Sequence, residues 1–142
     1  MLRQTYKSII GKTKACYPDA FFVDVTRSRK SILSPSWNLL NDYKNGLVDW
    51  TGYTERFKEE MEKPKAVREM LGIAKKAQKK DVFLVCFEGP LAGDKCHRFI
   101  LLDLISKIAI EHGIEVVVSK EYACLEDQKK NKQSKQMILS CF

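Results

Sequence analysis

The chain has 142 residues, of which 44% are hydrophobic and 10% aromatic, and its 25 Lys and Arg against 18 Asp and Glu give a net charge of +7. This length suits one domain, and the apolar content excludes a disordered polypeptide. The excess of positive charge favours anionic partners, namely nucleic acid, nucleotides or other phosphorylated molecules.

The apolar stretches of the chain do not have the pattern of a signal peptide or a membrane span. No apolar segment follows the first four residues, MLRQ, and the apolar stretch over residues 99–110 is broken by Asp103 and Lys107. Signal peptides and membrane spans both need an uninterrupted apolar run. We therefore expect a cytoplasmic protein with no membrane partner.

Two short runs near the N-terminus predict strands. One lies near residues 6–10 and is closed by Gly11. The other covers residues 20–25, where Asp24 is the polar exception. An apolar run of this length, bracketed by turn residues, is typical of a buried strand.

Two helices are predicted next. Ser34 is expected to be the N-cap of the first, with Pro35 at the first helical position and Gly46 just past the end. The second covers residues 49–62. Its large side chains fall near one face: Trp50, Tyr53, Phe57 and Met61. Such a stripe favours core packing over a base-stacking platform.

The second half of the chain alternates helix and strand. A helix that opens at Pro64 precedes the clearest strand, residues 81–87, and a helix over residues 96–112 leads to a further strand, residues 114–118. Strand, helix and strand within about 40 residues form a βαβ unit, which implies a parallel sheet with a right-handed crossover. The predicted fold class is α/β: a small single-domain, open, mostly parallel sheet with helices on its faces.

The domain organisation follows from the composition. Residues 1–120 are expected to form the single α/β domain, and residues 121–142 a basic C-terminal tail. The tail is predicted to be a loose helix or an extension, and its apolar end, residues 137–142, has the pattern of an edge strand that docks on the sheet.

Polar side chains gather where two of the predicted strands end. Asp24 and Glu88 lie near strand carboxyl ends, Arg27 follows the first strand, and Cys96-His97-Arg98 follows the second. Open α/β sheets place their ligands at this edge, so these groups converge if the two strands are neighbours. Such a mixture can position an anion and move protons.

The candidate catalytic residues are Asp24, Glu88, Cys96 and His97, and the candidate substrate-binding residues are Arg27 and Arg98. A thiolate at a helix N-terminus beside cations has a lowered pKa and can act as a nucleophile, although a small buried thiol is the commoner case. For His97 a structural hydrogen bond and proton transfer are equally open. The two carboxylates can equally form salt bridges with the arginines.

The loop before the last long helix does not have a glycine cradle for phosphate. Asp94 is an N-cap candidate, and its carboxylate would take the backbone N–H groups that a phosphate would use. Neither the P-loop pattern nor G-x-G-x-x-G is present. A bound anion would therefore rely on arginine forks.

The five cysteines are Cys16, Cys86, Cys96, Cys124 and Cys141. An odd, widely spread set does not resemble a disulfide framework, so we expect reduced thiols. Structural zinc sites pair ligands roughly two to four residues apart, usually twice over, and Cys86, Cys96 and His97 lack that pattern. No metal or cofactor is predicted, although sparser three-ligand catalytic zinc sites follow no such spacing.

Four segments together resemble the domain of unknown function 488 family. They are VDVTR at residues 23–27, SPSWNLL at 34–40, DYKNG at 42–46, and the pair Cys-Phe-Glu at 86–88 and Cys-His-Arg at 96–98. The resemblance covers about residues 20–112. The loop over residues 89–95, which is longer, and the basic tail after Val118 depart from the family pattern.

This resemblance implies a small, three-layer-like α/β domain. The positions that match the family motif are Asp24, Arg27, Glu88, Cys96, His97 and Arg98. The family has no agreed activity, so the resemblance implies a shared site without naming a substrate.

Three functions are open from the sequence. An enzyme that acts on a nucleotide or nucleic acid is favoured. The alternative is a non-catalytic nucleic-acid- or protein-binding module that uses the lysines of the tail. A thiol redox function is weaker because no Cys-x-x-Cys is present. The sequence does not predict the oligomeric state.

Overall fold

The structure is a computed structural model and describes residues 1–89 and 95–123. The elements in chain order are β1 (Leu2–Tyr6), the 3₁₀ turn η1 (Lys7–Ile9), α1 (Ile10–Cys16), β2 (Phe21–Asp24), the 3₁₀ turn η2 (Arg27–Arg29), α2 (Trp37–Lys44), α3 (Trp50–Glu60), α4 (Pro64–Ala77), β3 (Val82–Cys86) and α5 (His97–Glu111). None of these helices is both long enough and apolar enough to span a membrane.

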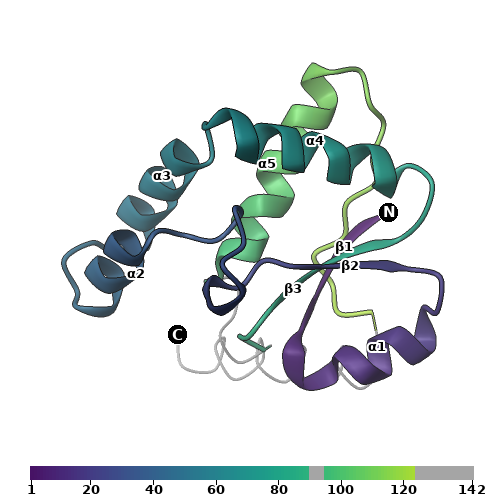
Figure 1. Cartoon of the computed structure of the whole chain (residues 1–142), viewed down its shortest axis with the longest axis horizontal. Coiled ribbons are helices and arrows are strands. Elements are labelled where there is room, and N and C mark those ends of the chain that lie inside the picture. The colour runs from purple at the N-terminus through teal and green to yellow at the C-terminus, as the bar shows by residue number, and fades with distance from the viewer. Residues whose placement is uncertain (90–94, 124–142) are drawn as a thin grey trace, which may run out of the picture.

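The three strands form one parallel sheet in the order β1-β3-β2. The central strand β3 is buried along its whole length, as expected for a parallel strand covered on both faces. Helices α4 and α5 lie on one side of the sheet and α1 lies on the other (Figure 1). The predicted fold class, a small α/β domain with a parallel sheet, is confirmed.

Alternation along the strands divides the side chains between the two faces of the sheet. Val82, Leu84 and Cys86 belong to the core that the sheet shares with α3, α4 and α5. Phe83 points to the other face, where its ring stacks on that of Phe22 with centroids 5.2 Å apart. Successive side chains of a strand point to opposite faces of the sheet, so residues an even number of positions apart share a face and are said to have the same parity. This parity decides which residues at the strand ends can share a site.

The N-terminal strand lies earlier in the chain than predicted. The expected strand near residues 6–10 is wrong: the strand is Leu2–Tyr6, and residues 10–16 are helical, with Gly11 inside the helix. Pairing with β3 buries Leu2 and Tyr6, and this tertiary contact outweighs local preference.

The first predicted helix begins two residues later than expected. Its N-cap is Ser36 rather than Ser34, and the Ser36 hydroxyl accepts a hydrogen bond of 3.1 Å from the Leu39 N–H. The Ser36 N–H also donates to the Glu60 carboxylate at 2.8 Å, a contact that comes from α3 and that no local pattern shows. Gly46 does follow the helix end, at a φ of +73° that favours glycine.

The segment after α5 does not form the regular strand predicted over residues 114–118. It makes a single parallel bridge, between Val118 and Leu2, flanked by a 2.8 Å hydrogen bond from the Leu2 N–H to the Val117 carbonyl. Val117 is 65% exposed, so only part of this segment has an apolar face to bury.

Two further predictions concern residues outside the described ranges. Helix α5 has Cys96 as its N-cap, so the expected cap, Asp94, is replaced there, and Asp94 itself is not among the described residues. The predictions for residues 124–142 of the tail lie outside the described residues as well.

Candidate functional site

A pocket of about 350 Å³ opens at the carboxyl ends of β2 and β3. Its volume falls within the range of small-molecule sites, roughly 300–1,000 Å³. The described residues that line it come from the loop after β2, from α2 and α3, from the end of β3 and from the start of α5: Thr26, Arg27, Ser28, Pro35, Trp37, Leu40, Tyr43, Lys44, Trp50, Tyr53, Cys86, Phe87, Glu88, Lys95, Cys96 and His97. The two strands are neighbours in the sheet, as the predicted convergence requires.

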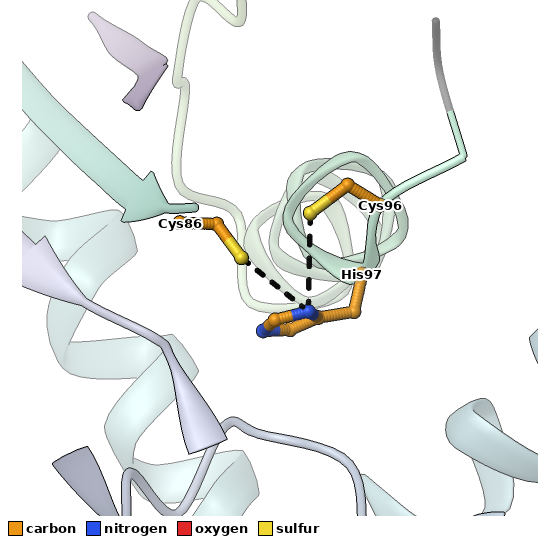
Figure 2. A group of neighbouring side chains, drawn as sticks. All are labelled: Cys86, Cys96 and His97. Carbon is orange, nitrogen blue, oxygen red and sulfur yellow. Dashed lines mark hydrogen bonds between the residues drawn. The ribbon is translucent and has the colours of Figure 1, made fainter. Parts of the chain in front are cut away.

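The floor of the pocket carries two thiols, an imidazole and a carboxylate. Cys86 at the end of β3 and Cys96 and His97 at the start of α5 are only 3%, 4% and 7% exposed. The His97 Nδ1 lies 3.8 Å from the Cys86 Sγ and 3.9 Å from the Cys96 Sγ (Figure 2). One oxygen of the exposed Glu88 carboxylate accepts hydrogen bonds from both thiols, at 3.1 and 3.3 Å.

The backbone of the strand-end segment fixes the imidazole. The His97 Nε2 lies 2.6 Å from the carbonyl oxygen of Val25. Because a carbonyl oxygen only accepts hydrogen bonds, Nε2 carries the hydrogen, and Nδ1 is the atom that faces the two sulfur atoms. The ring of Phe57 packs against the imidazole with centroids 5.7 Å apart.

The two thiols have different acidities. The hydrogen bond from Cys86 lowers the pKa of the Cys96 thiol, and nearby His97 and Arg98 lower it further against the effect of burial. The same hydrogen bond and burial raise the pKa of Cys86. Cys96, at the N-terminus of α5, is therefore the more acidic of the two thiols.

The segment after β3 brings Glu88 over the thiols. Gly89 runs so close to the Tyr6 ring that a Cβ at this position would lie 3.1 Å from a ring carbon. On the outer side, the Lys7 ammonium lies 4.7 Å from the centre of the exposed Phe87 ring. A residue with a side chain at position 89 would displace this turn.

Aromatic side chains form one wall of the pocket. The Trp50 and Tyr53 rings stack with centroids 5.0 Å apart, and Tyr43 lies 4.9 Å from Tyr53. Tyr53, together with Phe57 and Met61, is buried, in agreement with the predicted core stripe. Trp50 and Tyr53 also line the pocket, so part of this stripe both packs in the core and forms the pocket wall.

Cations lie at the rim. The Arg27 guanidinium stands 5.2 Å from the centre of the Trp37 ring, which is 55% exposed. No carboxylate within the described ranges lies at ion-pairing distance from Arg27. Lys44 and Lys95 also line the pocket, and Glu88 is the one carboxylate among the described lining residues. The described lining therefore carries more positive than negative side chains.

Two predicted site residues lie outside the lining. Asp24 is in register with Val85 and has the parity of the α1 side, where it binds the Lys7 ammonium at 2.8 Å. Arg98 is fully buried and donates to the Gln4 amide oxygen at 2.9 Å. The pocket therefore joins four of the predicted residues, Arg27, Glu88, Cys96 and His97.

Sequence reasoning left several lining residues out of the predicted site. Of these residues, Cys86 could most easily have been predicted from the sequence. It lies on the same face of the strand as the core residues Val82 and Leu84, and it ends the strand just before the site. The wall residues Trp37 and Tyr43 come from α2, whose place beside the strand ends depends on long-range packing.

Asp24→Asn is expected to lower the unfolding free energy by about 1 kcal/mol near neutral pH, a value reduced for the partial exposure of the pair. Burial raises the pKa of Asp24, but hydrogen bonds from Lys7 and Thr26 outweigh it, so the pKa lies below its ordinary value of 3.8. A carboxyl with a lowered pKa stabilises the fold above its unfolded pKa and loses this effect as the pH falls through the folded pKa. In urea unfolding, the gap between variant and native protein should close below pH 3.8; a gap of the same size at both pH values would contradict this role.

The fold and the pocket define a small parallel α/β protein with a thiol- and imidazole-bearing pocket at its strand ends. A family model described as the active DUF488-N3 subclade matches residues 23–109, more than half of the chain. The chain therefore belongs to the domain of unknown function 488 family, as its motifs predicted. No curated protein and no solved structure matches the chain.

Proposed function

We propose that the protein is an enzyme that acts on a nucleotide or a nucleic-acid end bound in the strand-end pocket. The observation that carries the proposal is that one pocket combines three kinds of side chain: reactive groups at its floor, aromatic rings in its wall and cations at its rim. Perturbed titratable groups in a concave, mostly apolar pocket are the usual features of an active site.

The aromatic wall supports the binding of a base. Nucleobases stack on aromatic side chains, with about 1–3 kcal/mol per stacked base. Trp37 offers an exposed face at the rim, and Trp50 contributes the partly buried part of the wall. The Tyr53 phenol, whose pKa burial raises, stays neutral and can donate a hydrogen bond to a base edge.

The cationic rim supports the binding of a phosphate. Arg27 is held beside Trp37 without a competing carboxylate in the described part of the chain, and a guanidinium binds phosphate through two parallel hydrogen bonds. Lys44 and Lys95 also line the pocket and add positive charge to it. A ligand with one base and one phosphate can engage both features.

The floor supports chemistry on the bound ligand. Cys96 contacts both His97 and Glu88, and all three residues line the pocket, so a nucleophile, a proton carrier and a carboxylate lie close together. In this proposal Asp24 shapes the strand end and Arg98 the base of α5, from outside the lining.

Calorimetric titration with a nucleoside monophosphate, the free nucleoside and inorganic phosphate tests the proposal. The monophosphate should bind at least about tenfold tighter than either fragment, because it uses wall and rim together, a gain of about 1.4 kcal/mol. Added salt should weaken the monophosphate and phosphate but not the nucleoside. Equal affinity for monophosphate and nucleoside, or no binding of any of them, would refute the proposal.

The same mixtures, and a short oligonucleotide, analysed by mass spectrometry report turnover. Conversion of ligand that is lost in Glu88→Gln supports an enzyme. Binding without conversion would favour the alternative, a non-catalytic binding module. The tail lysines that this alternative invokes lie outside the described residues.

A further inference from the structure

We propose that Cys86, Cys96 and His97 bind a Zn²⁺ ion at the floor of the pocket, beside the Glu88 carboxylate that contacts both sulfur atoms. The inference deepens the proposed function and rests on it only for the role of the ion in turnover. The binding of the ion itself depends on the three ligand side chains alone. It replaces the expectation from the sequence that no metal site is present.

The distances between the donor atoms of Cys86, Cys96 and His97 are close to those of a tetrahedral zinc centre. Zinc binds thiolate sulfur at about 2.3 Å and imidazole nitrogen at about 2.0–2.1 Å, so the donors of a tetrahedral site stand roughly 3.5–3.8 Å apart. The His97 Nδ1 lies 3.8 and 3.9 Å from the two sulfur atoms, and the Glu88 oxygen lies 3.1 and 3.3 Å from them. The ligand atoms of Cys86, Cys96 and His97 all lie within 4.8 Å of one another.

The orientation of the imidazole is that of a metal ligand. Metal-bound histidines usually donate their second ring N–H to a carbonyl or carboxylate, which fixes the ring and its tautomer. The His97 Nε2–H makes this bond to the Val25 carbonyl, and Nδ1 is aimed at the space between the two sulfur atoms (Figure 2). The strand end and the helix start thus present three soft or borderline donors before any ion binds.

The burial of the donors points the same way. Both thiols are nearly inaccessible, yet they lie beside a carboxylate, and hydrogen bonds among these groups leave acidic protons crowded in one place. A divalent cation replaces these protons and neutralises the cluster. A redox pair of Cys86 and Cys96 would not require an imidazole nitrogen and a carboxylate oxygen in contact with both sulfur atoms.

Glu88 differs from the three ligands in its exposure. Cys86, Cys96 and His97 are buried, whereas Glu88 is exposed and lies on the pocket side. Two thiolates and one imidazole are a known ligand set of catalytic zinc, whose fourth position is left to water or substrate. The fourth position is therefore left to water or to a bound ligand, on the pocket side beside the Glu88 carboxylate.

Titration of the reduced full-length protein with Co²⁺ tests the site directly. One equivalent should produce the sulfur-to-cobalt charge-transfer and tetrahedral d–d absorption bands, and Zn²⁺ should abolish them. Cys86→Ser and Cys96→Ser should weaken binding by more than the roughly 10–100-fold that loss of an outer partner costs. Cys16→Ser is the matched control, because Cys16 is exposed and distant in sequence, and it should bind Co²⁺ as the native protein does.

A second measurement on the native chain covers the case in which a serine variant fails to fold. Zn²⁺ should protect Cys86 and Cys96 from alkylation, mapped by mass spectrometry, while Cys16 reacts at the same rate with and without the ion. It should also raise the Tm of the native protein and of Cys16→Ser. Absence of the cobalt bands together with unchanged alkylation of Cys86 and Cys96 would overturn the site.

The outcomes separate this inference from the proposed function. Metal binding in a protein that binds no nucleoside monophosphate would leave the zinc site standing and refute the function. Nucleotide binding with neither cobalt bands nor protection of Cys86 and Cys96 by Zn²⁺ would refute the zinc site alone.

Discussion

Arg98→Ala is expected to lower the unfolding free energy by about 3–5 kcal/mol, a shift in Tm of roughly 10 °C for a chain of this size. Arg98 is fully buried, and it donates to the Gln4 amide oxygen and, at 3.0 Å, to the Tyr122 hydroxyl. The Gln4 amide in turn donates to the Lys120 carbonyl at 2.9 Å. The guanidinium thus connects β1, α5 and the segment around Tyr122, and its removal leaves a cavity and takes the hydrogen-bond donor from the buried Gln4 amide oxygen.

Because Arg98 buries a positive charge, a variant that keeps the volume of the side chain but removes the charge is the control for this prediction. The NH1 group of Arg98 has no hydrogen-bond partner in the described part of the chain, so the charge itself is costly to bury. Arg98→Met fills most of the volume without that charge and should lose clearly less stability than Arg98→Ala. Chemical denaturation of both variants decides the matter: an Arg98→Ala protein as stable as the native one would show that Arg98 does not hold this part of the fold.

Much of the fold follows from local signals. Asp49, whose side chain accepts from the Gly52 N–H at 2.8 Å, and Pro64 begin their helices where the pattern places them. The strand over residues 82–86 and the helix after it also lie within a residue or so of the predicted bounds. Caps, proline and a continuous apolar run act within a few residues, and such signals can be read without the tertiary structure.

The errors arise where distant contacts decide the outcome. Ser34 and Ser36 both precede the same helix, and Glu60, which lies 24 residues further on, binds Ser36. Leu2 and Tyr6 become a strand because β3 lies beside them. The pattern around each residue is the same whether these partners are present or not, so the local sequence cannot choose between the alternatives.

The sequence pointed to the edge of the sheet where the pocket lies, but not to all of the residues that line it. Parallel strand ends and the start of a helix locate the edge, and four of the six predicted residues line the pocket there. Asp24 has the parity of Val85, which faces α1, and Arg98 turns from the pocket towards Gln4. A strict count of alternation would have paired Cys86 with the site and set Asp24 apart; the direction of the Arg98 side chain depends on β1 and could not be read from the helix.

Arg27→Ala is expected to weaken binding of a nucleoside monophosphate by roughly 10–100-fold, corresponding to the loss of about 1.5–3 kcal/mol from hydrogen bonds to a charged group. Arg27 lines the pocket, and its Nε is shielded from solvent without a hydrogen-bond partner among the described residues. Its hydrogen bond to the Ser34 hydroxyl is long, 3.4 Å, so the variant should fold. The long contact to Ser34 and the position beside the Trp37 ring leave the guanidinium at the rim of the pocket, where an anion can bind it.

The measurement that tests the central claim most directly is a matched titration of Arg27→Ala and Arg68→Ala with the same nucleoside monophosphate. Both variants remove one positive charge, but Arg68 lies exposed on α4, away from the pocket lining. The pocket as the binding site predicts that Arg27→Ala loses at least about tenfold in affinity while Arg68→Ala stays within about twofold of the native protein. Equal weakening in the two variants would mean that the ligand senses only the overall charge, and would contradict a specific site at the strand ends.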